Sequence, residues 1–128
     1  MHIDDIAAPS ADSFKFAEIG DTIRGTIVHV PDKPYQRVNQ FNGREEEVIR
    51  IVISTDDGER AIYPVRGSFM AQAIAQAVRD SGNTQLEAGG TLAVQYAEDR
   101  GTGKPNPAKV FKAQYKAPVT GTTVDDLI

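Results

Sequence analysis

The sequence predicts an all-β fold, a five-stranded Greek-key β-barrel with one helix between its third and fourth strands. Five short runs are rich in β-branched residues and alternate apolar with polar side chains, and one longer run changes to helical spacing. Two long irregular segments, Asp32–Glu47 and Glu98–Ala108, follow the first strand and join the last two. This layout is that of the OB-fold, whose second and third strands and two long loops form the usual ligand face. Other small barrels and α+β sandwiches also fit these elements.

The first three strands are bounded by turn-forming residues. Thr22–Val30 follows a Gly-Asp turn and is stopped by Pro31. Val48–Thr55 alternates three isoleucines with other residues and leads through an Asp-Asp-Gly turn into Arg60–Val65. Because Pro64 has no N–H for a strand ladder, the third strand should end, or lie at a sheet edge, near that residue.

The next segment has the period of a helix, with Ser68 as its N-cap and Gly82 as its C-terminal stop. Its apolar residues recur at helical spacing: Phe69, Met70, Ala73, Ile74, Ala77 and Val78. The alternating pattern then returns in Gly89–Ala97 and Lys109–Tyr115, which are the predicted fourth and fifth strands.

Several aromatic residues are expected to pack rather than to bind. Three of them lie in phase with the alternating apolar residues and are predicted core residues: Tyr96, Phe111 and Tyr115. Phe14 and Phe16 are expected to close one end of the barrel. The sequence does not decide whether Tyr63 faces the core or the solvent, because Ile62, on the opposite face of the same strand, is a competing core residue.

The chain of 128 residues suits one domain, with 40% hydrophobic and 25% charged residues. We expect a loose N-terminal arm over residues 1–17, the OB-fold domain over 18–116 and a flexible acidic-hydrophobic tail over 117–128. The chain has no cysteine, no signal-peptide pattern and no apolar run near the roughly 20 residues that span a bilayer. These features predict a cytoplasmic protein without a membrane partner.

The net charge of −4 is unevenly distributed along the chain. Residues 1–21 together with 125–126 contain seven acids and one base, which leaves 11 acids and 13 bases in between. The region of the predicted barrel is therefore slightly basic. Because the excess acidic residues lie near the chain ends, the net negative charge of the whole chain argues only weakly against nucleic-acid binding.

No pattern in the sequence predicts catalysis, a metal site or a cofactor. The two histidines, His2 and His29, lie in the predicted arm and in a strand, and no zinc-ligand spacing accompanies them. Gly101–Pro105 resembles part of a phosphate loop, but it lacks the full motif and no helix follows it. The sequence therefore predicts a protein that is not an enzyme.

The loop after the first strand has the composition of a site for single-stranded nucleic acid. Tyr35 and Phe41 stand outside any alternating core pattern, with cationic residues around them. In such sites cations neutralise phosphates while aromatic rings stack on bases, each stack contributing roughly 1–3 kcal/mol. The alternative is that either ring folds back over the barrel and that the cations only aid solubility.

Further cations are expected on the second and third strands and across the mouth of the barrel. Arg50 and Ser54 share the face opposite the isoleucines of the second strand, and Arg60 and Arg66 should extend that surface. The predicted nucleic-acid-binding residues are Lys33, Tyr35, Arg37, Phe41, Arg44, Arg50, Arg60, Arg66, Arg100, Lys104, Lys109 and Lys112.

The last residues form an acidic and apolar tip, in which Asp125 and Asp126 precede Leu127 and Ile128. One interpretation is that this tip is a frayed chain end without function. After a barrel and a linker, however, such a tip resembles the plan of bacterial single-stranded DNA-binding proteins, whose tips dock on replication and repair proteins. The resemblance implies that these four residues dock on a partner protein.

Two stretches, "IYPVRGSFMAQAIAQAVRDSG…LEAGGTLAVQYAED" and "KVFKAQYKAP", also look like small OB-fold proteins of actinobacterial phages that are thought to bind single-stranded DNA. The likeness covers roughly Phe14–Pro118 and is one of layout rather than of a diagnostic signature. The chain departs from the bacterial pattern in its aliphatic end, its short linker and its lack of tryptophan.

These features together predict a sequence-tolerant single-stranded DNA-binding protein of phage replication, recombination or repair, in the host cytoplasm. Its expected partners are single-stranded DNA and, through the tip, replication or recombination proteins. The alternatives are an OB-type adaptor that binds protein, or a virion or assembly component without DNA binding. Self-association into a homo-oligomer stays open.

Overall fold

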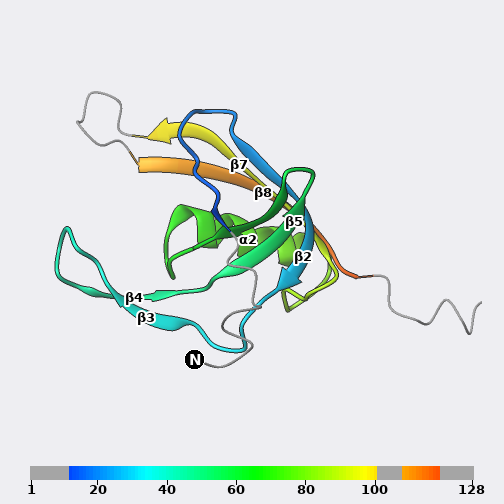
Figure 1. Ribbon diagram of the computed structural model, residues 1–128, viewed down its shortest axis with the longest axis horizontal. Helices are drawn as coiled ribbons and strands as arrows, with labels where there is room; N and C mark the ends of the chain where they lie inside the picture. Colours follow the sequence, from blue (N-terminus) through cyan, green and yellow to red (C-terminus); the bar gives the residue numbers. More distant parts are fainter. Residues whose placement is uncertain (1–11, 101–107, 119–128) are drawn as a thin grey trace, which may run out of the picture.

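A computed structural model of the chain describes residues 12–100 and 108–118 and shows a mostly β protein with one helix (Figure 1). The strands are β1 (Asp12–Ser13), β2 (Thr22–His29), β3 (Tyr35–Val38), β4 (Glu45–Val48), β5 (Ile51–Thr55), β6 (Gly58–Ile62), β7 (Thr91–Arg100) and β8 (Ala108–Lys116). The helix α2 (Phe69–Asp80) lies between β6 and β7 in the chain, as the sequence predicts.

Six of the strands form one sheet in the order β1-β6-β5-β2-β7-β8, while β3 and β4 form a separate hairpin. All pairs in the sheet are antiparallel except β1 with β6, which is parallel. No closed barrel is present among the described strands, because β1 occupies the free edge of β6 and β8 pairs with β7 alone. The mostly β fold is thus confirmed, whereas the closure of the barrel is not.

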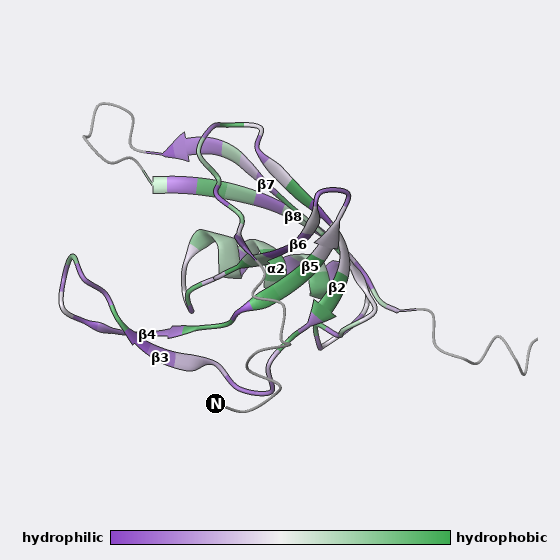
Figure 2. Ribbon diagram, in the orientation of Figure 1, coloured by the Kyte–Doolittle hydropathy of each residue, from purple (hydrophilic) through white to green (hydrophobic). Residues whose placement is uncertain are grey.

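The core follows from the two-residue period of the strands, which turns every second side chain to the same face. β2 buries Ile23 and Ile27, and β7 buries Leu92, Val94 and Tyr96 against them. Figure 2 shows the hydrophobic colour concentrated on β2, β5 and α2, with the β3–β4 hairpin mostly hydrophilic. The helix covers this apolar face with Ile74, Ala77 and Val78.

Both ends of α2 carry the signals read from the sequence. The Ser68 hydroxyl oxygen accepts a hydrogen bond of 3.2 Å from the backbone N–H of Ala71, which satisfies an otherwise unpaired donor of the first turn. At the other end Gly82 has a φ of +82°, a left-handed conformation that a side chain disfavours. The expected start and stop of the helix are therefore confirmed.

The described end of the predicted N-terminal arm is packed against the sheet. The backbone N–H of Phe14 donates to the carbonyl of Ala61 in β6, at 2.9 Å. Phe16 is buried and makes edge-to-face contacts with Phe14 and Phe111, with ring centroids 4.8 and 5.0 Å apart. These rings close one end of the core, while residues 1–11 of the arm lie outside the described residues.

Candidate nucleic-acid interface

The long segment after β2 contains the β3–β4 hairpin, which the sequence analysis treated as an irregular loop. Its register pairs Tyr35 with Val48 and Arg37 with Glu46. Arg37 and Glu46 form a cross-strand ion pair of 3.1 Å, and such opposed pairs stabilise antiparallel strands. The hairpin is attached to the rest of the fold by a bridge between Val48 and Val65.

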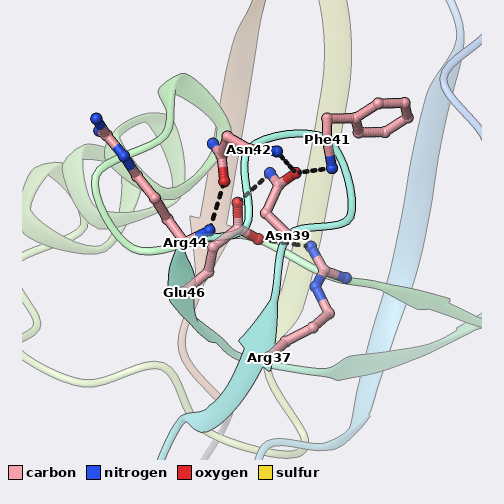
Figure 3. A network of polar contacts seen from close by, with 6 residues as sticks. All are labelled: Arg37, Asn39, Phe41, Asn42, Arg44 and Glu46. Atoms are coloured by element: carbon pink, nitrogen blue, oxygen red, sulfur yellow. Dashed lines mark hydrogen bonds and ion pairs between the residues drawn. The ribbon is translucent and has the colours of Figure 1, made fainter.

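Polar contacts order the tip of this hairpin (Figure 3). The side-chain oxygen of Asn39 accepts from the backbone N–H groups of Phe41, at 2.8 Å, and Asn42, at 3.3 Å, an arrangement that fixes a turn. The amide nitrogen of Asn39 donates to Glu46 at 2.5 Å. Gly43 supplies the left-handed residue of the turn with a φ of +69°. The tip therefore has a defined conformation.

The two aromatic residues of the hairpin face solvent. Phe41 is 100% exposed, so its ring does not fold back to cover the core; Tyr35 is 40% exposed and is in register with the buried Val48. In Figure 3 the Phe41 ring points away from the polar contacts that hold its backbone. Val38, which the sequence analysis did not single out, is 58% exposed on the same hairpin. A fully exposed phenylalanine on an ordered turn is available for a ligand to contact.

The predicted cations near the hairpin differ in what they contact. Arg37 pairs with Glu46, and Arg66 pairs with Glu47 at 2.7 Å. The pKa of Glu46 is lowered by the hydrogen bond from Asn39 and next by the one from Arg37, and the pKa of Glu47 is lowered chiefly by Arg66. Both carboxylates thus stay charged and offset part of the positive charge.

Two other predicted cations of the hairpin segment are exposed: Lys33 and Arg44. Neither takes part in the two ion pairs found among the described residues. The backbone N–H of Arg44 donates to the side chain of Asn42 at 2.8 Å, so the residue sits within the ordered tip (Figure 3). The positive charge that remains available beside the two rings therefore comes chiefly from Lys33 and Arg44.

The predicted cationic surface on the second and third strands does not form as expected. Arg60 is in register with Ile53, and directly opposed residues of an antiparallel pair share a face. Arg60 therefore lies on the isoleucine face, opposite the face of Ser54, and the prediction that it extends the Arg50 surface is wrong. Arg50 is half-buried, and its Nε donates to the Tyr63 hydroxyl at 3.3 Å.

The predicted cations of the last two strands also separate. Lys109 shares the inner side of β8 with Phe111, whereas Lys112 is exposed on the outer side. The ammonium of Lys109 donates to the carbonyl of Phe16 at 2.7 Å, and the guanidinium carbon of Arg100 lies 5.3 Å from the centroid of the Phe69 ring. Lys109 and Lys112 therefore lie on opposite faces of β8.

The other predicted site residues lie outside the described part of the chain: Lys104, Asp125, Asp126, Leu127 and Ile128. Conversely, the sequence analysis missed Asn39, the central residue of the tip, although an Asn followed at short range by Asn-Gly is a turn signal. The core aromatics Tyr96 and Tyr115 are buried as predicted, and Phe111 is partly buried against the same core.

The described residues contain no group of three or more His, Asp or Glu side chains that would hold a metal ion. Within the same residues, no helix is long and apolar enough to cross a membrane. No protein-family model, curated protein or solved structure matches this chain.

Proposed function

We propose that this chain is an OB-fold single-stranded DNA-binding protein of phage replication, recombination or repair, without catalytic activity. The observation that supports it best is the β3–β4 hairpin, on which Phe41 is fully exposed and Tyr35 is partly exposed. Lys33 and Arg44 lie on the same segment, so two aromatic rings and two cations occur within one short stretch of chain.

This arrangement suits a flexible, negatively charged strand. Bases of single-stranded DNA are free to stack on Phe41 and Tyr35, and every base has a face for stacking, so the binding tolerates sequence. The cations attract phosphates and release counterions, which makes the affinity fall steeply with salt. The ordered tip lowers the entropic cost of binding, because the backbone of Phe41 is already held by Asn39 before DNA arrives.

The order of the elements supports the OB-fold part of the proposal. Strands β2, β5 and β6 precede the helix, and β7 and β8 follow it, which is the connectivity of that fold. The hairpin lies between β2 and β5, in the first of the two long loops that commonly form the ligand face. The tip residues Asp125–Ile128 remain a proposed docking segment for replication or recombination proteins, as the resemblance to bacterial relatives implies.

A second candidate, an adaptor that binds protein, is favoured by one specific feature. Two adjoining apolar cavities of about 470 and 240 Å³ lie beside α2 and share Ile49, Pro64, Ala71, Ala75 and Arg79. Ile49 is exposed at the mouth of this groove. A partner held there would bury apolar surface, so its affinity would depend weakly on salt, in contrast to DNA binding.

Titration of the full chain with labelled oligo-dT, oligo-rU and duplex DNA at a low and a high salt concentration tests the proposal. The expected result is tighter binding of oligo-dT than of duplex, with an affinity that falls strongly as salt rises. Absence of binding at low salt, or a preference for duplex over single strands, would refute it.

A further inference from the structure

The outer face of β2, β7 and β8 is a positively charged surface that the predicted site includes only through Lys112. The register of these strands aligns three rows of side chains. The rows are Thr22–Gln95–Lys112, Arg24–Ala93–Gln114 and Thr26–Thr91–Lys116. Directly opposed residues share a face, so all of these side chains lie on one side of the sheet. Eight of them are exposed and Ala93 is half-buried, whereas the opposite side carries the core.

This outer face contains three cations, Arg24, Lys112 and Lys116, and its other members are Thr, Gln and Ala. Neither of the two ion pairs among the described residues involves any of the three. Three carboxylates lie at the margins: Glu98, which is exposed and in register with Val110, two residues from Lys112 on the same face, and then Glu59 and Asp80. Glu59 is in register two strands beyond Thr26, and Asp80 at the end of α2 accepts a hydrogen bond of 2.7 Å from Gln76.

The three charges lie within the reach of one extended polyanion. Lys112 and Lys116 are four residues apart on one strand, about 14 Å at the usual rise per residue, and Arg24 lies two strands, about 10 Å, from Gln114 between them. The backbone separations between these cations exceed the Debye length of about 8–10 Å at ordinary salt, so each cation acts as a separate phosphate contact, and their fields overlap only at low salt. A polyanion lying on the face would meet all three.

The face is also hollowed. A cleft of about 230 Å³ is lined by Thr22, Arg24, Gln95, Lys112 and Gln114, with the small side chain of Ala93 on its wall. An adjoining cavity of about 620 Å³ shares Arg24, Ala93 and Gln114 and continues to Thr91 and Lys116, with Asp80 on its far wall. The depression therefore runs across all three rows, and its hydroxyl and amide groups can donate to phosphate or sugar oxygens.

We propose that this outer face holds the sugar–phosphate backbone of the bound single strand, with Arg24, Lys112 and Lys116 as its phosphate contacts. The inference rests on the proposed function and extends it, because Arg24 and Lys116 lie outside the hairpin and were not predicted site residues. Base stacking on the hairpin and phosphate binding on the outer face are then separate parts of one binding path. In Figure 1 the β3–β4 hairpin lies at the opposite end of the view from β7 and β8.

Three variants of the full chain test this assignment: Arg24→Gln with Lys116→Gln, the charge-preserving Arg24→Lys with Lys116→Arg, and Tyr35→Ala with Phe41→Ala. Both outer-face positions are exposed, so thermal melting should be unchanged in the first two variants. The affinity for a long labelled oligo-dT is measured over a series of salt concentrations. Loss of two phosphate contacts should reduce the slope of log affinity against log salt by about 1.4, at about 0.7 per contact.

The charge-preserving variant should keep the wild-type slope, and the hairpin variant should lose affinity at an unchanged slope. If the Gln variant keeps both the affinity and the slope while the hairpin variant loses binding, the proposed function stands and the outer-face assignment is wrong. If the wild-type chain fails to bind oligo-dT at low salt, both are wrong. Polyglutamate is used as a second probe, in place of an acidic protein. If the Gln variant binds DNA as the wild type does but loses binding to polyglutamate, the face serves an acidic protein and the assignment is again overturned.

Discussion

Replacing Phe41 by alanine separates a ring that binds a ligand from a ring that supports the fold. Because Phe41 is 100% exposed, its removal takes no buried apolar surface from the core, and the free energy of unfolding should change by no more than about 0.5 kcal/mol. The ring's proposed partner is a DNA base. Loss of one stacked base costs roughly 1–3 kcal/mol, which corresponds to an affinity about 5- to 150-fold weaker.

Phe16→Ala is the matched control, since Phe16 is buried between Phe14 and Phe111. Truncation of a buried phenylalanine costs about 3–5 kcal/mol, which in a domain of this size lowers the melting temperature by about 10 °C or more. The assays are thermal melting and fluorescence anisotropy with oligo-dT at low salt. A large loss of stability in Phe41→Ala would show that the ring covers apolar surface. Wild-type affinity in that variant would show that Phe41 does not stack on DNA.

Three further perturbations each have a defined expected outcome. Gly25→Ala should strongly destabilise the fold in thermal melting, because a Cβ there would lie 1.9 Å from the Ser54 carbonyl oxygen; a melting temperature equal to wild type would contradict that packing. The lowered pKa of Glu47 means that its contribution to hairpin stability is full above the ordinary value of 4.5 and is lost as the pH falls through the lower folded value. The protection of the hairpin amides against hydrogen exchange, relative to the intrinsic rate at each pH, should therefore fall there. Glu47→Gln should weaken that pH dependence and leave the part due to Glu46, whose pKa is also lowered; an unchanged pH dependence would refute the role of the Arg66 pair. Deletion of residues 124–128 should leave the melting temperature unchanged and the oligo-dT affinity equal or slightly higher. It should abolish the pull-down of replication proteins from infected cells. Loss of folding would refute the docking role.

The regular elements were largely predictable because local chemistry specifies them. The helix was recognised from its apolar period and from the Ser68 cap, and both agree with the structure. The third predicted strand was expected to end near Pro64, and β6 ends at Ile62. The β3–β4 hairpin was missed, since its strands, YQRV and EEEV, lack apolar alternation. The cross-strand ion pair of Arg37 with Glu46 and the bridge to Val65 hold it, and neither is visible in a single strand's pattern.

The candidate site was only partly predictable, for two different reasons. The separation of Lys109 from Lys112 follows from alternation alone, since residues three apart on a strand face opposite sides. The cations of the outer face could not be predicted from alternation alone. Arg24 and Lys116 come to lie on one face only because β2 pairs with β7 and β7 pairs with β8. Pairing between strands distant in sequence depends on the whole fold, and the sequence pattern of one strand does not reveal it.

The most direct test of the central claim is to follow the backbone amide signals of the ¹⁵N-labelled full chain by NMR while unlabelled oligo-dT is added. The largest changes are expected at the hairpin tip, Asn39–Arg44, and at Tyr35, where the exposed rings should stack on bases. Changes confined to the groove beside α2, around Ile49 and Ala75, would contradict it, as would a spectrum that oligo-dT leaves unaltered.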